Sequence, residues 1–313
     1  MAGKVEEKRI LAKELHKPSR VHYKRRKFIM KGIDDTWQID LVEMHKFARE
    51  NKGFNYILTG IDVFSKFAFA VPVKNKTGRD VSAAFQKVLS DMKRTPKNVQ
   101  SDLGKEFYNS IFQDLMKTYS INHYSTFSNQ KSFFCERLNR TLKEIMYKEF
   151  TVHGSYKWLN LLPKVVSFYN NRVHRTIGMK PADVRKKDEK YLLKNIYQIK
   201  PGKKVVPKFK VGDVVRVSKQ KTVFTKGYTQ SWSNEQFTIK KVQMTIPPTY
   251  LLKDYQGNPV LGGFYEQELQ KSTLKGVYFI EKVIKRSGKK IFVKWLGFDD
   301  THNSWINDTA LIT

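Results

Sequence analysis

The apolar positions between Thr36 and Asn171 predict a unit that mixes strands and helices. The runs "WQIDLVEM" and "YILTGIDVFSKFAFAVPV" are rich in β-branched and aromatic residues, as in a pair of antiparallel strands. The segment "GRDVSAAFQKVLSDM" has helical spacing, and "NVQSDLG" follows as another strand. Three more helices are predicted at "SIFQDLMKTYSI", "CERLNRTLKEIMYKEF" and "YKWLNLLPKVVSFYNN", with a short strand "NHYST" after the first. This order is typical of an α/β fold.

The pattern changes on both sides of this unit. Residues 1–33 form a basic arm, which we expect to be a helix or an ordered strap, and residues 186–207 are charged and read as a linker. Residues 208–272 alternate between short apolar runs and turns, which predicts a small all-β barrel. Residues 273–313 carry two alternating runs around Ser287-Gly288, as a hairpin would.

The charge of the chain indicates its partner. The 313 residues include 59 Lys and Arg against 29 Asp and Glu, a net charge of +30. This balance favours nucleic acid over the alternative of a basic ribosome-associated or membrane-surface protein. No run of about 18 apolar residues is present, so no membrane partner is expected. The one cysteine, Cys135, excludes an intramolecular disulfide and favours a reducing compartment.

Three carboxylates stand where neighbouring elements could bring them together. Asp40 lies within the first predicted strand, Asp102 at the end of the strand predicted at "NVQSDLG", and Glu136 in the first turn of a long helix. Carboxylates this close repel one another unless a cation balances them, and their hard oxygen ligands favour Mg²⁺ or Mn²⁺. Two such ions would suit phosphodiester transfer.

The helix of Glu136 also carries a candidate phosphate-binding face. Asn139, Arg140 and Lys143 follow Glu136 at +3, +4 and +7, on the same side of the helix. An ordinary surface helix with a Glu136–Arg140 ion pair is the alternative, and the two aspartates favour the functional interpretation. Asp62, in "GIDVF", is a rival carboxylate, which only the resemblance described below excludes from the set.

Five segments together resemble the catalytic core of retrovirus-type integrases over residues 34–185: "WQIDLVEM", "DVFSKFAFAVPVK", "SDLGKEF", "ERLNRTLKE" and "YNNRVHRTIGMKPADV". The stretch from "ELHKPSR" to "DLVEM" is most similar to the integrases of Maverick or Polinton elements and related virophages. The resemblance implies an RNase H-like core with a mixed sheet. It also implies processing of element DNA ends and joining of their 3′-hydroxyls to target DNA.

The same resemblance assigns the residues of the site. Asp40, Asp102 and Glu136 become the catalytic and metal-binding triad, with Mg²⁺ or Mn²⁺ as cofactor and two ions per site. Asn139, Arg140 and Lys143 match helix positions that contact the element's DNA end. Glu43, Glu106 and Glu144 fall outside the triad. The segment "STFSNQKSFF" is expected to form a tight loop before the helix.

The C-terminal parts carry two further resemblances. "FKVGDVVRVSK" resembles the start of an SH3-like barrel, and "VYFIEKVIKR" with "KIFVKWLGFDDTHNSW" resembles a chromodomain. The chromodomain resemblance places Tyr278, Trp295 and Phe298 in a cage for methyl-lysine, with a methylated histone tail as partner. Strand alternation puts Trp295 on the face of Ile291 and Val293, so a role in the core stays open.

The leading hypothesis is a DNA integrase that acts on double-stranded DNA as a homo-oligomer in the host nucleus. A domesticated, catalytically silent DNA- and chromatin-binding protein is the alternative, and an RNase H-like nuclease acting on RNA ranks last. Retroviral integrases carry a His-His-Cys-Cys zinc domain, whereas this arm has His16 and His22 and no cysteine. No structural zinc is therefore expected.

Overall fold

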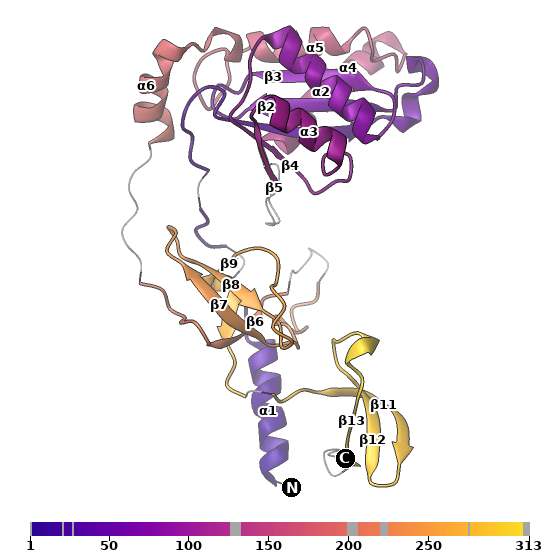
Figure 1. The fold of residues 1–313 in the computed structure, drawn as a ribbon, viewed down its shortest axis with the longest axis vertical. Helices are drawn as coiled ribbons and strands as arrows, with labels where there is room; N and C mark the ends of the chain where they lie inside the picture. The colour runs from indigo at the N-terminus through magenta and orange to yellow at the C-terminus, as the bar shows by residue number, and fades with distance from the viewer. Residues whose placement is uncertain are drawn as a thin grey trace. The chain divides into compact units, whose positions relative to one another are not determined.

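The chain divides into two compact units in a computed structural model that describes residues 2–20, 22–26, 28–125, 133–198, 206–219, 225–274 and 276–308. The core unit is Phe28–Lys200, and the terminal unit combines Met1–Lys27 with Pro201–Thr313 (Figure 1). Most of the loop expected at "STFSNQKSFF" lies outside the described residues. Within the described chain, no helix is both long and apolar enough to cross a membrane.

The core unit is built on a mixed sheet of five strands in the order β3-β2-β1-β4-β5. The central strand β1 pairs antiparallel with β2 and parallel with β4. The second apolar run of the sequence therefore contains a hairpin rather than one strand. The strands are β1 Thr36–Glu43, β2 Tyr56–Asp62, β3 Ala68–Val73, β4 Asn98–Ser101 and β5 Asn122–Ser125.

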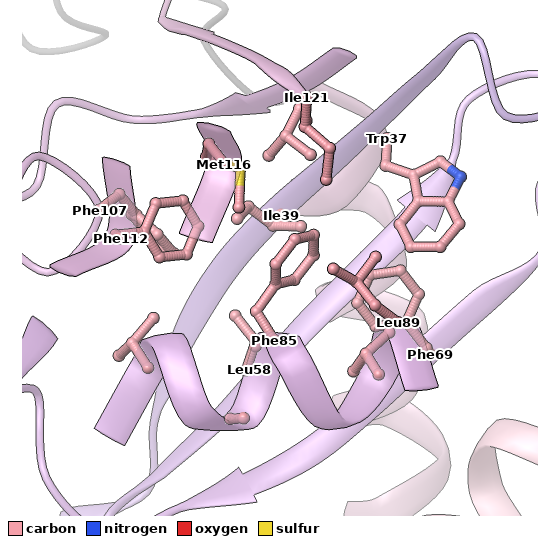
Figure 2. Packing of buried hydrophobic residues seen from close by; sticks show 14 of the residues in the cluster. Trp37, Ile39, Leu58, Phe69, Phe85, Leu89, Phe107, Phe112, Met116 and Ile121 are labelled. Atoms are coloured by element: carbon pink, nitrogen blue, oxygen red, sulfur yellow. The ribbon is translucent and has the colours of Figure 1, made fainter. Parts of the chain in front are cut away.

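Helices cover both faces of this sheet (Figure 1). The helices are α2 Gly78–Met92, α3 Ser110–Thr118, α4 Phe133–His153 and α5 Leu162–Asn171. Trp37 and Ile39 of β1 point to the face of α2 and α3, in the cluster drawn in Figure 2. Because strand side chains alternate between faces, Gln38 and Asp40 point to the other face, where α4 and α5 pack. This alternation places the first carboxylate under α4.

The segment expected to be a linker instead belongs largely to the core unit. Short helical turns, among them α6 Glu189–Tyr191, run from Lys186 to Tyr197. Leu192 is fully buried against Val63 and Phe64. The apolar positions 192, 193 and 196 have helical spacing, and the lysines around them hid this pattern in the sequence.

The terminal unit contains α1 Ala2–His16 and two antiparallel sheets. The larger sheet has the order β10-β6-β7-β8-β9, and the smaller one has the order β11-β12-β13. Its strands are β6 Val214–Val217, β7 Phe237–Gln243, β8 Thr249–Lys253, β9 Phe264–Tyr265, β10 Leu269–Lys271, β11 Ile280–Ser287, β12 Lys290–Trp295 and β13 Ser304–Asn307. The hairpin expected at Ser287-Gly288 is confirmed by the pairing of β11 with β12. The SH3-like and chromodomain assignments stay predictions.

A buried ion pair fastens the N-terminal helix to the larger sheet of the terminal unit. Glu14 accepts a hydrogen bond of 2.5 Å from the Nε of Arg216, whose side chain is fully buried. Thr273 donates to the same carboxylate through its backbone N–H at 2.9 Å, and Ser272 through its hydroxyl at 3.0 Å. Burial alone would raise the pKa of Glu14, but these hydrogen bonds outweigh it and hold the pKa below its ordinary value. The N-terminal arm is thus a structural part of this unit.

We predict that Glu14→Leu lowers the free energy of unfolding of the terminal unit by about 3–5 kcal/mol, because it leaves the Arg216 guanidinium buried without its counter-charge. Urea unfolding followed by tryptophan fluorescence measures this change. Glu7→Leu is the matched control, since Glu7 is exposed on the same helix. Equal unfolding midpoints for the two variants would contradict a stabilising role for the pair.

Candidate active site

Asp40 is a half-buried carboxylate near the middle of the sheet, facing α4. Its Oδ1 accepts from the backbone N–H of Leu41 at 2.9 Å, and its Oδ2 accepts from the side-chain amide of Asn139 at 2.8 Å. Burial raises the pKa of the Asp40 carboxyl, and the charges of Asp102 and Glu136 raise it further. Three carboxylates predicted from the sequence therefore lie close enough to act electrostatically on one another.

Asp102 follows β4 in a turn whose glycine is required by a close approach. The Asp102 Oδ1 accepts from the Gly104 N–H at 3.1 Å, as in a tight Asx turn. A Cβ on Gly104 would lie 2.5 Å from the Glu106 carboxyl group. Glu106 itself is buried and pairs with Lys76 at 3.0 Å, so it stabilises this turn.

A chain of hydrogen bonds fixes the backbone at Asp102. The Gln113 amide donates to Nδ1 of His123 at 2.8 Å, so the imidazole proton sits on Nε2 and is donated to the Ser101 hydroxyl, also at 2.8 Å. Ser101 in turn donates to the Asp102 carbonyl at 2.8 Å. Burial lowers the pKa of His123 to about 4, which keeps the ring neutral at physiological pH. The position of Asp102 thus rests on uncharged groups.

Glu136 lies in the first turn of α4, where the structure confirms the helix start that was predicted. The side-chain oxygen of Gln38 accepts from the N–H groups of Phe134 at 3.0 Å and of Cys135 at 3.2 Å. Helix N-termini have no internal partners for these groups, so Gln38 supplies one. Glu136 is exposed at the edge of the site.

The carboxylates have oxygens available for a divalent ion but are not drawn together into a preformed cluster. Among the residues that the structure describes, no three His, Cys, Asp or Glu side chains lie close enough to hold a metal ion together. Mutual repulsion explains this spacing, since like charges separate when no cation lies between them. Each carboxylate oxygen that accepts one hydrogen bond keeps a further lone pair, so Asp40, Asp102 and Glu136 fit a hard cation in their chemistry.

The helix face expected to contact DNA is divided by the structure. Asn139 is 9% exposed, and its amide oxygen accepts from the Thr59 hydroxyl at 2.7 Å while its nitrogen holds Asp40. Both ends of this amide are used inside the protein, and contact between Asn139 and DNA stays a prediction. Arg140 and Lys143 are exposed, and Lys143 lies near enough to lower the pKa of Asp40 in part.

The rival carboxylates lie elsewhere. Asp62 is 1% exposed, and it accepts from Arg94 at 3.1 Å and from the Ser65 hydroxyl at 2.5 Å. Glu144 is exposed and pairs with Lys148 at 2.9 Å. These bonds give both residues structural partners.

Residues 33–128 match the family model described as the integrase core domain. This part of the chain is similar to integrase core domains. The mixed five-stranded sheet fits the RNase H-like fold expected from the sequence. The chain is similar in fold to one in the simian T-cell lymphotropic virus intasome solved in complex with PP2A regulatory subunit B56 gamma. The TM-score is 0.57 at 15% identity, over 82% of this chain and 86% of that one.

Two sequence relatives extend the likeness beyond the integrase core. Over 192 residues the chain is 36% identical to a transposon-derived protein of Caenorhabditis elegans, covering 61% of this chain and 65% of that protein. Over 150 residues it is 29% identical to the Pol polyprotein of feline endogenous virus ECE1, covering 47% of this chain and 14% of the polyprotein. The matched segments thus span less than two thirds of each relative.

The sequence did not reveal the polar residues that support the integrase core site. Gln38, Gln100 and His123 have no charge at neutral pH and belong to no motif that was recognised. One signal was present: the triplets Gln38-Ile39-Asp40 and Gln100-Ser101-Asp102 share the spacing Gln-x-Asp. A two-residue spacing on a strand puts both side chains on one face.

The three aromatic residues expected to form a cage do gather in the terminal unit. The ring of Tyr278 lies 6.1 Å from that of Trp295 and 5.3 Å from that of Phe298, both in edge contacts. Trp295 is half-buried, unlike its fully buried strand neighbours Ile291 and Val293. Binding of methyl-lysine stays a prediction.

We predict that stability of the core unit falls as the pH drops from about 6.5 to about 4, because His123 gains a proton in the unfolded chain while its folded environment keeps it neutral. A His123→Gln variant should show a shallower fall, by roughly 1 kcal/mol per pH unit in this window. Urea titrations at pH 4.5 and pH 7 measure the slope. The exposed His45, replaced by Gln, is the control, and equal slopes in all three proteins would refute the role of His123.

Proposed function

We propose that this protein is a DNA integrase that processes the ends of a transposable element and joins their 3′-hydroxyls to target DNA. The observation that carries the proposal is the convergence of Asp40, Asp102 and Glu136 from β1, the end of β4 and the start of α4, within an integrase core. Similarity to a transposon-derived relative supports a transposable element, and we propose that this element is of the Maverick or Polinton kind.

The three carboxylates would hold Mg²⁺ or Mn²⁺, with two ions per site. Bound divalent ions supply Lewis-acid activation of the attacking oxygen and stabilise the leaving oxygen of the phosphodiester. Asp40 is kept in place by Asn139, and the Asp102 backbone by Ser101. Burial raises the pKa of Asp40, and the negative charges of Asp102 and Glu136 raise it further; a bound cation would offset this part of the shift.

Exposed basic residues beside the site are suited to bind the DNA. Arg140 and Lys143 lie one and two turns beyond Glu136 on α4, so they would contact phosphates of the DNA end held at the carboxylates. The net charge of +30 supports binding of double-stranded DNA along a longer path. We further propose a homo-oligomer on DNA, because two element ends must be joined at neighbouring target phosphates.

Two proposals concern the setting of the reaction. The aromatic cluster of Tyr278, Trp295 and Phe298 is proposed to take a methylated histone tail, and the host nucleus is proposed as the location. Electron-rich ring faces attract a methylated ammonium through cation–π forces. The alternative of a domesticated and catalytically silent protein shares the DNA and chromatin contacts, so joining activity separates the two.

We predict that Glu136→Gln abolishes joining of labelled element ends to plasmid DNA while DNA binding survives, because the change removes a metal-binding charge without altering size. Glu144→Gln is the control, since Glu144 is exposed two turns along the same helix. Gel analysis of joined products in Mg²⁺ makes the comparison. If the Glu136→Gln protein joins DNA ends at the wild-type level, the assignment of Glu136 to the triad is wrong.

We also predict that Arg140→Ala and Lys143→Ala each make the salt dependence of DNA binding less steep. The slope of log affinity against log salt should change by about 0.9 for each phosphate that the protein no longer neutralises. Fluorescence anisotropy at several salt concentrations measures the slope. Lys87→Ala is the control, because Lys87 is on α2, which covers the opposite face of the sheet. If Arg140→Ala and Lys143→Ala show the same slope as Lys87→Ala and the wild type, DNA does not bind along this face of α4.

A further inference from the structure

Strands β1 and β4, which lead to Asp40 and Asp102, also carry a buried pair of amides. In the parallel pairing of β1 with β4, Gln38 is the direct partner of Gln100, and each is 2% exposed. Two residues beyond Gln38, on the same face of β1, comes Asp40, and two residues beyond Gln100, just after the end of β4, comes Asp102. The amide pair is thus the layer of side chains next to the two carboxylates.

The orientation of the Gln38 amide is fixed by its partners. Backbone N–H groups can only donate, so the oxygen of Gln38 must face Phe134 and Cys135, at 3.0 and 3.2 Å. Its nitrogen is then left to donate to the side-chain oxygen of Gln100 at 3.0 Å. One amide therefore joins the two carboxylate-bearing strands to the first turn of α4.

Glu136 is the next residue after this attachment. Asn139, one turn later, makes the second attachment of α4 through its bonds to Asp40 and Thr59. Between the two attachments, the helix has little freedom to rotate or slide over the sheet. These two attachments therefore set the direction in which the Glu136 side chain projects from the helix.

We infer that Gln38 is a positioning residue that orients Glu136 toward Asp40 and Asp102 by holding the first turn of α4, and so sets the affinity of the site for divalent ions. This inference rests on the proposed function. Burying two amides costs free energy that apolar side chains of the same volume would avoid. A requirement for one fixed orientation of the first turn of α4 explains why buried amides are present here despite this cost.

The matched control comes from the same unit. Asn51 is also buried, at 1% exposed, and its oxygen also accepts from two consecutive backbone N–H groups, those of Trp158 at 2.7 Å and Leu159 at 3.2 Å. It lies on the segment between β1 and β2, and its amide nitrogen donates to the carbonyls of Phe47 and Tyr156, away from the three carboxylates. Replacing it removes an equivalent pair of hydrogen bonds without touching the start of α4.

The test is calorimetric titration of Mn²⁺ into the full-length chain, with Mg²⁺-dependent joining as a second measurement. Loss of a residue that orients a metal ligand typically weakens metal binding by about 10- to 100-fold. We expect Gln38→Met to weaken Mn²⁺ binding at least about 10-fold and to raise the Mg²⁺ requirement of joining in parallel. Affinity for DNA without metal should be unchanged. Asn51→Leu should leave the Mn²⁺ affinity at the wild-type value while lowering stability in urea.

Unchanged Mn²⁺ affinity in Gln38→Met, or an equal loss in Asn51→Leu, would overturn the inference. Gln38→Asn serves if the Met variant does not fold, since its shorter amide remains polar but withdraws from α4, and the same loss of affinity is expected. If the wild-type protein neither binds Mn²⁺ nor joins DNA, the proposed function falls as well. A wild type that does both, beside a Gln38 variant with normal affinity, rejects this inference alone.

Discussion

Repulsion between three carboxylates is the constraint around which the core unit is organised. Asp40, Asp102 and Glu136 act on one another's charge, and no cation of the described protein is bonded directly to them. The groups that hold them are neutral: an asparagine amide, a serine hydroxyl backed by a neutral histidine, and a glutamine at the helix start. Neutral supports fix position without cancelling charge. The site therefore keeps its attraction for an external cation.

The terminal unit, in contrast, contains a buried carboxylate with a charged partner. There the buried carboxylate of Glu14 is neutralised by Arg216, and its hydrogen bonds attach the N-terminal helix to the larger sheet. The bond from Thr273 to Glu14 spans 259 residues of sequence. Contacts of this separation form late in folding, because a long loop must close first. The N-terminal helix thus finds its place only when the C-terminal strands exist.

Much of this architecture could be predicted from the sequence, because strands and helices of the core unit show clean apolar periods. The positions of Asp40, Asp102 and Glu136 on their elements were predictable for the same reason. The spacing of Asn139 from Glu136 predicts a shared exposed face, whereas its spacing from Leu138 and Leu142 places it at the buried side of the helix. Those residues form the buried side of α4.

What remained hidden depends on partners distant in sequence. The structural role of the Gln38 amide could not be predicted from neighbouring residues, because its partner on α4 is 96 residues away. His123 looks like an ordinary strand residue until Gln113 and Ser101 fix its tautomer. Local propensity carries no information on such contacts, whereas tertiary packing decides them.

We propose that the Asp40, Asp102 and Glu136 carboxylates near the middle of the sheet form a divalent-metal site. Anomalous scattering from crystals of the protein grown with Mn²⁺ tests it most directly. We expect anomalous peaks beside the carboxylates of Asp40, Asp102 and Glu136, which would hold the ions. Manganese bound only elsewhere, with these three carboxylates apart and free of metal, would contradict it.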